Sequence, residues 1–395
     1  MAKFDTDRSL PKPFQDHNFA ILPIARGKYR IGEFRLYEKI PRVSWTNRSA
    51  ITRLELPGHI HSIDSSVLKS EAVAINAAYA CRALQLFLDE DELLPTLGGR
   101  LGTGTFNFNV LTRSGHTVEI PVKNAQMEID GCFEGLRTIG IIEAKSKFSQ
   151  DFLIRQLYFP YRFAVTRDYI NKKVRPVFQI FSNNTFYFFE YAFQDQTNYN
   201  SLQLIRQAQY RLQDRILTIS DLADILDEDI EFQSNLSPDK YKAPAFPQAD
   251  SFERLVSLCE FINETGERTN SEITDYFRFD IRQTNYYTAA LRFLNLGKRV
   301  KLTGKTAYIL TDETAKALKS GFADRQLYFA KRMLNHPVLR EAFATFLERG
   351  IYPEKDYAVA LMRKHGVDVT QGSTTERRRA QTIIAWIKWL DSLSV

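Results

Sequence analysis

A short apolar run, Thr138–Ala144 (TIGIIEA), ends in charged positions. Its β-branched residues predict a strand that is buried on both faces. Glu143 and Lys145 lie at the end of this strand, and because side chains alternate along a strand, both project from one face. A second short strand is expected upstream, ending at Asp130. The hydrophobic pattern therefore predicts that two strand ends bring their charges to one point.

The rest of residues 1–232 mixes helix and strand patterns. Ser70–Leu88 repeats apolar residues at helical spacing and begins with a residue suited to the N-cap, so it predicts a helix. Leu202–Leu226 is also expected to be helical. Phe106–Val122 and Val174–Tyr191 have the composition of paired strands joined by turns. Strands and helices around one sheet are typical of an α/β domain.

The C-terminal part of the chain has a different pattern. Residues 233–250 carry three prolines and little periodicity, which predicts a linker. In 251–322, three helices followed by a hairpin predict a winged helix-turn-helix domain. Residues 323–395 are expected to form a second small helical domain, for which a winged-helix variant is one interpretation. The predicted fold is therefore an α/β domain followed by mainly α domains.

The third helix of 251–322 is expected to begin near residue 281 and to be the DNA-recognition helix. Near its start stand four side chains that can contact DNA, namely Arg282, Gln283, Asn285 and Tyr286. Recognition helices meet base edges at this end, where Arg, Gln and Asn can pair bidentately with guanine or adenine. Lys305, at the tip of the hairpin, is expected to lie over the DNA backbone. A protein–protein module is the alternative interpretation of this domain.

The last helix, expected at 374–393, carries three arginines in its first turns, Arg377, Arg378 and Arg379. Cations at a helix N-terminus oppose the helix dipole, so an external anion would relieve them. A phosphate or a guanine of DNA is one candidate, and a solvated run of charge is the alternative.

Charge is distributed unevenly along the chain. The net charge is +6, and residues 251–395 contribute all of it, with 23 Lys and Arg against 17 Asp and Glu. This asymmetry is expected of a region that meets phosphates, although a solvated basic face is the ordinary interpretation. The charge therefore favours nucleic acid as the partner of the C-terminal part.

The composition is that of a cytoplasmic protein without a membrane partner. Cys81, Cys132 and Cys259 are too widely spread for a disulfide framework or a zinc cluster, and their use suits a reducing compartment. No apolar run approaches the ~20 residues of a membrane span, and the N-terminus lacks the apolar core of a secretory signal. His59 and His61 are interpreted as structural.

The charges at the two strand ends have a chemistry in common. Carboxylate oxygens hold Mg²⁺, which activates water and offsets charge on a phosphate, and a neighbouring lysine stabilises the same charge. The alternative is a solvated Glu–Lys pair on a surface strand. The apolar character of the strand and a second acidic pair, Glu128 and Asp130, argue against that alternative. We therefore expect Asp130, Glu143 and Lys145 to be catalytic.

The motif D-x₁₂-E-A-K, formed by Asp130, Glu143 and Lys145, resembles the active-site signature of the PD-(D/E)xK nucleases. The chain as a whole resembles a type II restriction endonuclease of that superfamily, although Ile129 stands where the signature has a proline. The resemblance implies a mixed-sheet PD-(D/E)xK nuclease core over residues 1–232, with Mg²⁺ as cofactor. It also implies double-stranded DNA as substrate, a homodimer during cleavage, and a cognate methyltransferase that acts on the same site without needing to bind the nuclease.

Two further site residues follow from the resemblance. The first core helix of many such nucleases presents a glutamate to the metal, and Glu71 matches it. Its other interpretation is a carboxylate that is favoured by the helix dipole. The helix after the catalytic strand carries a glutamine near the site, and Gln156 matches it. The expected metal ligands are then Asp130, Glu143 and Glu71, and whether Glu128 joins them stays open.

Three functions compete at this point. The favoured one is a Mg²⁺-dependent, sequence-specific endonuclease of double-stranded DNA. The second is a repair or junction nuclease with the same core, whose helical domains read DNA shape. The third is a DNA-binding regulator without catalysis, and the intact set of Asp130, Glu143 and Lys145 argues against it.

Overall fold

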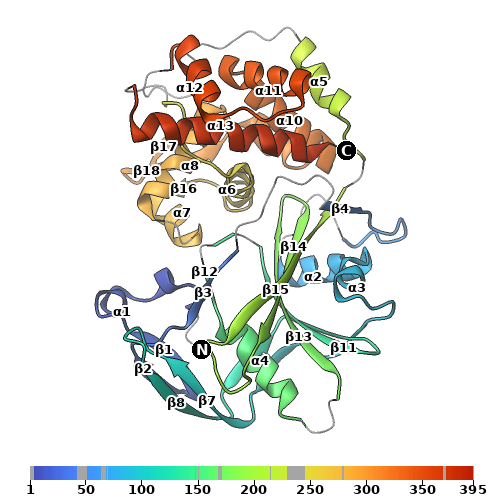
Figure 1. Ribbon diagram of the computed structural model, residues 1–395, viewed down its shortest axis with the longest axis vertical. Helices are drawn as coiled ribbons and strands as arrows, with labels where there is room; N and C mark the ends of the chain where they lie inside the picture. The colour runs from blue at the N-terminus through green and yellow to red at the C-terminus, as the bar shows by residue number, and fades with distance from the viewer. Residues whose placement is uncertain are drawn as a thin grey trace. The chain divides into compact units, whose positions relative to one another are not determined.

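The computed structural model describes residues 4–41, 51–63, 68, 70–146, 148–149, 151–167, 171–213, 215–228, 245–277, 280–367 and 371–394. The chain divides into two compact units, with nearly all described residues up to Leu212 in the first and those from Gln213 onward in the second. The first unit is mixed α/β with several sheets, and the second is mainly helical (Figure 1). The coarse fold class predicted from the sequence is therefore confirmed.

A seven-stranded sheet dominates the N-terminal unit, in the order β4-β15-β14-β13-β11-β10-β5. Its strands are β4 (Ile51–Leu54), β5 (Leu94–Pro95), β10 (Gly131–Glu134), β11 (Thr138–Lys145), β13 (Lys173–Ser182), β14 (Thr185–Phe193) and β15 (Leu202–Leu212). Strands β11 and β13 are parallel, whereas β10–β11, β13–β14 and β14–β15 are antiparallel. The parallel pair needs a crossover, which helix α4 (Arg155–Val165) provides.

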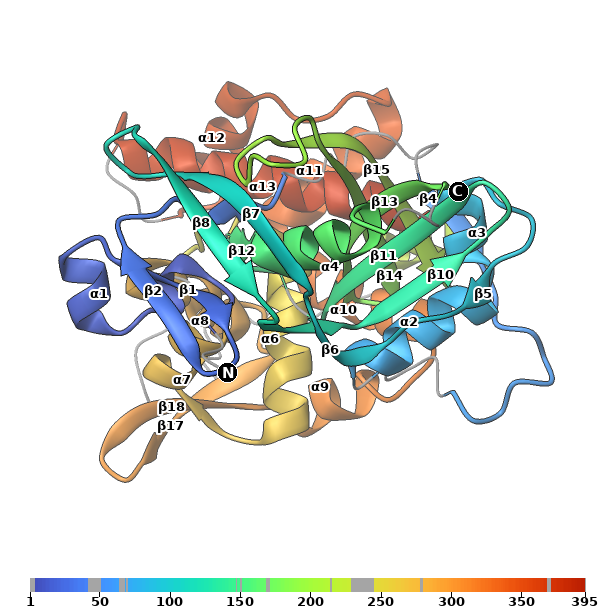
Figure 2. The same ribbon diagram turned by 90° about the horizontal axis from the view of Figure 1, so that it is seen from below.

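The expected buried strand is β11, which is buried at seven of its eight positions. Its even-numbered residues Ile142 and Ala144 join the core formed with α2 (Glu71–Ala80) and α3 (Ala83–Leu88). Its odd-numbered residues face the side of the sheet where α4 lies (Figure 2). The period of two therefore places Glu143 and Lys145 between the sheet and α4.

Smaller sheets complete this unit, together with short helices near the N-terminus. One sheet has the order β2-β1-β8-β7, and two-stranded pairs join β6 to β9 and β3 to β12. The bounds are η1 (Asp7–Ser9), α1 (Lys12–Asp16), β1 (Ala20–Ala25), β2 (Lys28–Gly32), β3 (Tyr37–Lys39), β6 (Gly99–Gly102), β7 (Thr105–Leu111), β8 (Thr117–Lys123), β9 (Gln126–Ile129) and β12 (Asp151–Leu153). Strand β9 leads directly into β10, and Asp130 stands between them.

Two expected helices have different structures. The helix predicted over Ser70–Leu88 is interrupted, because Arg82 adopts a left-handed backbone with φ of 65° between α2 and α3. Ser70 does cap α2, accepting a hydrogen bond from the main-chain N of Val73 at 3.2 Å. The helix predicted over Leu202–Leu226 is wrong: its first half is strand β15, and only α5 (Ile219–Asp227) is helical.

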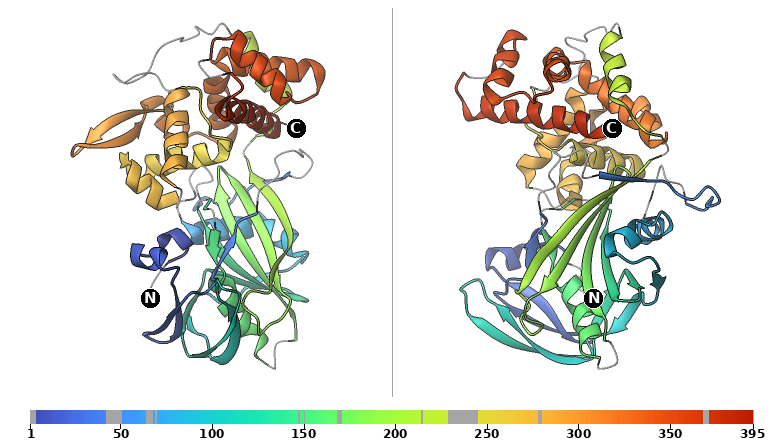
Figure 3. Two further views of the ribbon diagram at one scale, coloured as in Figure 1. Left: turned by 60° about the vertical axis from the view of Figure 1, so that its left-hand side comes forward. Right: turned by 45° about the vertical axis from the view of Figure 1, so that its right-hand side comes forward.

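After α5, the C-terminal unit contains the three helices and the hairpin that the sequence predicts for residues 251–322, together with a short strand, β16, that was not predicted. They are α6 (Phe252–Thr265), β16 (Arg268–Thr269), α7 (Asn270–Phe277), α8 (Ile281–Phe293), β17 (Gly297–Leu302) and β18 (Lys305–Leu310). The strands form an antiparallel sheet in the order β16-β18-β17. The expected helices and hairpin are thus confirmed, and the hairpin extends away from the helices of its unit (Figure 3).

The remaining helices share a core with these elements. They are α9 (Asp312–Ala317), α10 (Phe322–Leu334), α11 (Pro337–Arg349), α12 (Lys355–Lys364) and α13 (Thr374–Leu393). One hydrophobic cluster runs from Leu217 to Leu393. Within it, the indole N–H of Trp389 donates to Glu253 of α6 at 2.9 Å. Residues 251–322 and 323–395, expected as two domains, therefore lie in one compact unit.

The expected linker at 233–250 is only partly described, since 233–244 lie outside the described residues. Of the rest, Phe246 and Ala249 are buried in the C-terminal core, and the carbonyl of Ala249 accepts a 2.8 Å hydrogen bond from Trp386. The boundary between the two units falls at Leu212, not at 232. None of the helices in the described part of the chain combines the length and apolar character that crossing a bilayer requires.

Gly297 offers a test of packing in the C-terminal unit. A Cβ atom there would lie 2.5 Å from the main-chain oxygen of Ile309, on the paired strand. Gly297→Ala should therefore lower the free energy of unfolding by about 1–3 kcal/mol, measured by urea denaturation. Gly58→Ala is the control, because, apart from its chain neighbours, no described residue has an atom within 4 Å of its Cβ position. Equal stability of the two variants would contradict this packing.

Candidate active site

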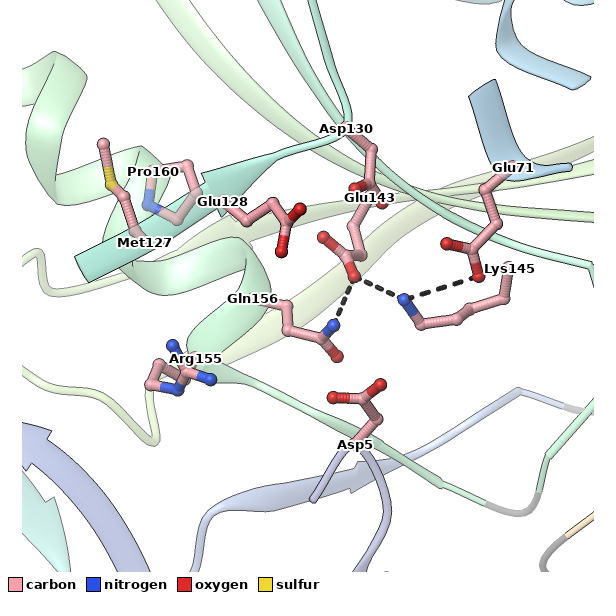
Figure 4. A pocket seen from close by; sticks show the side chains of 10 residues that line it. All are labelled: Asp5, Glu71, Met127, Glu128, Asp130, Glu143, Lys145, Arg155, Gln156 and Pro160. Carbon is pink, nitrogen blue, oxygen red and sulfur yellow. Dashed lines mark hydrogen bonds and ion pairs between the residues drawn. The ribbon is translucent and has the colours of Figure 1, made fainter. Parts of the chain in front are cut away.

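A cavity of about 120 Å³ in the N-terminal unit gathers charged side chains from segments far apart in the sequence (Figure 4). Its lining consists of Asp5, Glu71, Met127, Glu128, Asp130, Glu143, Lys145, Arg155, Gln156 and Pro160. All five side chains that the sequence predicts to be catalytic are among them. The structure therefore brings together residues of α2, the β9–β10 junction, β11 and α4.

The hairpin β10–β11 brings Asp130 to Glu143. Gly131 pairs with Ile142 across the two antiparallel strands, so the residues just beyond this pair, Asp130 and Glu143, are neighbours. The carboxylate of Asp130 accepts a hydrogen bond from the main-chain N of Ala144 at 2.9 Å. The local pairing of two strands is thus sufficient to assemble the two carboxylates.

Glu143 is the centre of a small polar network. Its Oε1 atom lies 2.5 Å from Nζ of Lys145 and also accepts a hydrogen bond from the side-chain amide of Gln156. Nζ of Lys145 lies 3.9 Å from Oε1 of Glu71, at the first turn of α2 (Figure 4). Only 4% of Glu143 is exposed. A glutamine from α4 and a lysine two residues away therefore fix the orientation of a buried carboxylate.

Burial and the neighbouring charges shift the pKa values of Glu143 and Lys145. Burial raises the pKa of Glu143 to about 8. The negative charges of Asp130 and Glu71 also raise this pKa, whereas the positive charge of Lys145 lowers it. Burial lowers the pKa of Lys145, but Glu143, Glu71 and Asp130 outweigh it, so the net pKa is above its ordinary value. Lys145 therefore stays an ammonium group.

The cavity also holds more negative than positive groups. Five carboxyl side chains line it, against the two cations Lys145 and Arg155. Close carboxylates repel one another, which a bound cation would relieve. The arrangement therefore favours a cation.

The donor chemistry fits Mg²⁺, which prefers oxygen ligands. Within the described residues, no three His, Cys, Asp or Glu side chains form a ready metal-binding group. The expected set of Asp130, Glu143 and Glu71 is therefore not assembled as three ligands, since Glu71 faces Lys145. Mg²⁺ often uses only one or two carboxylates and keeps several waters, so Asp130 and Glu143 suffice. Among the described residues, Oε1 of Gln156 is a further buried oxygen without a hydrogen-bond partner.

Two charged lining residues were not predicted from the sequence. Asp5 belongs to the N-terminal segment, and nothing in its neighbourhood signals a site. Arg155 precedes Gln156 at the start of α4 and is 6% exposed. The same helix carries a second buried arginine, Arg162, so the residue type alone could not single out Arg155.

The predicted DNA-contacting residues of α8 and its hairpin lie near the surface. Arg282 and Asn285 are exposed, whereas Gln283 and Tyr286 are half-buried. Asn285 also accepts a hydrogen bond from the amide of Asn270 at 3.3 Å. Lys305 is exposed directly after the tight turn at Thr303–Gly304. The structure therefore keeps these residues available for contact.

The three arginines of α13 do not share one environment. Arg377 and Arg378 are exposed, but only 8% of Arg379 is exposed. Residues three and four apart lie on one helix face, so Arg379 falls on the face of buried Glu376 and Ile383. The expectation that Arg379 contacts DNA is corrected by this burial.

Three family models match the chain. Residues 1–31 match a domain of unknown function (DUF6996), 32–211 match a second (DUF6997), and 254–394 match a third (DUF7226). No curated protein and no solved structure matches the chain significantly. The second match ends next to the boundary between the two units at Leu212. The cavity combines Asp5 from the first matched region with nine residues of the second.

Proposed function

We propose that this protein is a Mg²⁺-dependent endonuclease that hydrolyses phosphodiester bonds of double-stranded DNA at specific sequences. The observation that carries the proposal is the cavity in which Asp130, Glu143 and Lys145 meet, with Gln156 bonded to Glu143. These are the groups of the PD-(D/E)xK signature. They lie together although they come from different strands and a helix.

The order of elements around the cavity supports a PD-(D/E)xK core. Helix α2 precedes the hairpin β10–β11, and α4 then crosses to β13, which is parallel to β11. The signature residues stand at the β9–β10 junction and at the end of β11. This is the arrangement that the resemblance to these nucleases implies.

Four residues of the cavity have a role in this proposal. Asp130 and Glu143 would hold Mg²⁺, which when bound supplies an activated water and positive charge at the phosphate. Gln156 orients Glu143 through its amide hydrogen bond. Lys145 keeps a positive charge beside the carboxylates, where it can stabilise negative charge that develops on the phosphate.

The C-terminal unit is proposed to bind DNA as a winged helix. The order of α6, β16, α7, α8 and the hairpin β17–β18 supports this, as does the excess of basic residues. Arg282 and Asn285 would contact base edges, and Lys305, Arg377 and Arg378 would contact phosphates. In this proposal the protein works in the cytoplasm as a homodimer, beside a methyltransferase that modifies the same site.

The pattern of cleavage products tests the proposed function. Wild-type protein is incubated with several plasmids and Mg²⁺, and the products are separated on agarose. A sequence-specific enzyme gives discrete bands that differ between plasmids. A smear, or cleavage confined to branched DNA, would favour the repair or junction nuclease. Binding without any cleavage would favour the regulator.

Sequence reading by α8 is a separate prediction. Arg282→Ala should cost about 1–3 kcal/mol of binding at particular base pairs and relax discrimination there. Lys305→Ala should weaken binding to all sequences alike and make its salt dependence shallower by about one unit. Binding to the cognate duplex and to its single-base variants at several salt concentrations is the measurement.

Lys319→Ala, which replaces an exposed lysine in the turn after α9, is the control for a general charge effect. A uniform loss of affinity for Arg282→Ala, with base preference intact, would remove α8 as the reader. Arg377 and Arg378 would then be tested in its place.

A further inference from the structure

Arg155 is a buried cation of the N-terminal unit that forms no close ion pair with a described residue, although the carboxylates of Asp5 and Glu143 attract its charge. It is the first residue of α4, lines the cavity and is 6% exposed. No ion pair or side-chain hydrogen bond joins its guanidinium to another described residue. Its close partner is the ring of Phe159, with Cζ 5.6 Å from the ring centroid. The guanidinium of Arg155 therefore lines a polar cavity, and no hydrogen bond to another described side chain occupies its N–H donors.

Two other buried arginines of this unit, Arg162 and Arg175, have close protein partners, although Nε of Arg162 has no hydrogen-bond partner among the described residues. Arg162, on the same helix and also 6% exposed, donates to the carbonyl of Gln196 at 2.5 Å and lies 4.8 Å from the ring centroid of Phe106. Arg175 forms a 2.6 Å ion pair with Glu190. Placing a charge in a buried site without a partner is costly, and α4 adds to the cost because a cation at a helix N-terminus opposes the dipole. The attraction of Asp5 and Glu143 offsets part of this cost, but no close contact among the described residues uses the hydrogen-bond donors of the Arg155 guanidinium.

We propose that Arg155 binds a phosphate group of the nucleic-acid backbone inside this cavity. The proposal rests on the nuclease function above and deepens it by naming a phosphate-binding residue outside the D-x₁₂-E-A-K motif. A guanidinium presents paired N–H donors that match two phosphate oxygens. Arg155 and Lys145 lie on opposite sides of Gln156 (Figure 4). The two cations therefore bracket the position where a phosphate would lie beside Glu143.

Stability and binding separate this role from a structural one. Arg155→Met keeps an unbranched side chain and removes the charge, and Arg162→Met is the matched control on the same helix. Arg155→Met should unfold at the wild-type temperature or above it, because the desolvation cost of a buried charge is removed and no close ion pair with a described residue is lost. Arg162→Met should unfold several degrees lower, because the carbonyl of Gln196 loses the Arg162 donor and the hydroxyl of Tyr158 loses its hydrogen bond with Arg162. Thermal unfolding by circular dichroism measures both.

Duplex DNA binding in EDTA, at several salt concentrations, is the second measurement. Arg155→Met should make the slope of log K against log [salt] shallower by about one unit, because one phosphate contact is lost. Arg162→Met should leave the slope unchanged. With Mg²⁺, Arg155→Met should cleave about 10²-fold more slowly. Arg155→Lys, which keeps the charge but not the paired donors, should fall between the wild type and Arg155→Met.

The outcomes are distinct. An Arg155→Met protein that unfolds earlier than the wild type, or does not fold, shows that Arg155 supports the structure and overturns the proposal. An unchanged salt slope also overturns it. If the wild-type protein cleaves DNA while Arg155→Met gives one of these two results, the proposed nuclease function still holds and only the role of Arg155 is overturned. Wild-type protein that binds DNA but never cleaves it removes the nuclease function, and with it the phosphate role of Arg155 in catalysis.

Discussion

Asp130→Asn should abolish DNA cleavage, lowering the rate by roughly 10³-fold or more, while leaving DNA affinity near that of the wild type. The substitution removes one negative charge from the cavity and one strong oxygen ligand for Mg²⁺. It should not disturb the fold, because an asparagine oxygen can still accept the hydrogen bond from the main-chain N of Ala144. Cleavage of plasmid in Mg²⁺ and binding in EDTA are measured on the same preparation.

Glu143→Gln should lose cleavage as well, but it also removes the partner of Lys145, so its stability is measured alongside. Glu119→Gln is the control, since Glu119 is an exposed carboxylate of the same unit outside the cavity. Cleavage by Asp130→Asn at a rate close to that of the wild type would contradict the assignment of the metal ligands. Equal loss of DNA binding and cleavage would show that Asp130 acts on binding.

Glu190→Gln should lower the free energy of unfolding of the N-terminal unit by about 3–5 kcal/mol. Glu190 is 3% exposed and pairs with Arg175 at 2.6 Å and Arg206 at 2.8 Å. These arginines also donate to the carbonyls of Phe87 and Leu88 at the end of α3, so the network ties this helix to the sheet. The variant leaves two guanidinium groups without a carboxylate. Urea denaturation measures the loss.

The control for this network is Glu134→Gln, which removes a more exposed ion pair with Lys172 and should lower the free energy of unfolding by less than about 1 kcal/mol.

The ion pairs of Glu190 with Arg175 and Arg206 also predict that stability depends on pH. Burial raises the pKa of Glu190, but Arg175 and Arg206 outweigh it, so the net pKa is below its ordinary value. The two ion pairs of Glu190 therefore stabilise the folded unit fully at pH values above the ordinary pKa of a glutamate. This stabilisation is lost as the pH falls through the lowered pKa of Glu190. The gap between wild type and Glu190→Gln should therefore shrink on acidification, and a constant gap would contradict this origin.

The parts of the fold that follow from local patterns could be predicted from the sequence. The apolar run at 138–144 is β11, and the helices and hairpin between Phe252 and Leu310 lie close to their expected bounds. Leu202–Leu212 was misassigned because Leu, Gln, Arg and Ala are good helix formers, whereas pairing with β14 decides the structure there. The break at Arg82 depends on a backbone conformation that the apolar pattern does not reveal.

The residues of the candidate site also fall into two groups, those that local sequence patterns predict and those that only tertiary contacts bring to the cavity. Asp130, Glu143 and Lys145 could be found because one hairpin and a period of two bring them together. Glu71 and Gln156 needed the resemblance, since only the packing of α2 and α4 on the sheet brings them to the cavity. Asp5 and Arg155 lie there through tertiary contacts that no local pattern encodes. Arg379 was misassigned because three consecutive residues of a helix cannot share one exposed face.

The most direct test of the nuclease assignment is the rate at which EDTA-treated wild-type protein converts supercoiled plasmid to nicked and linear forms as Mg²⁺ is added. We expect no conversion before Mg²⁺ is added, then a rate that rises with Mg²⁺ and saturates, with discrete products. Asp130→Asn should give no products at any Mg²⁺ concentration. Conversion that persists in EDTA, or no conversion by the wild-type protein at any Mg²⁺ concentration on any plasmid tested, would contradict the assignment.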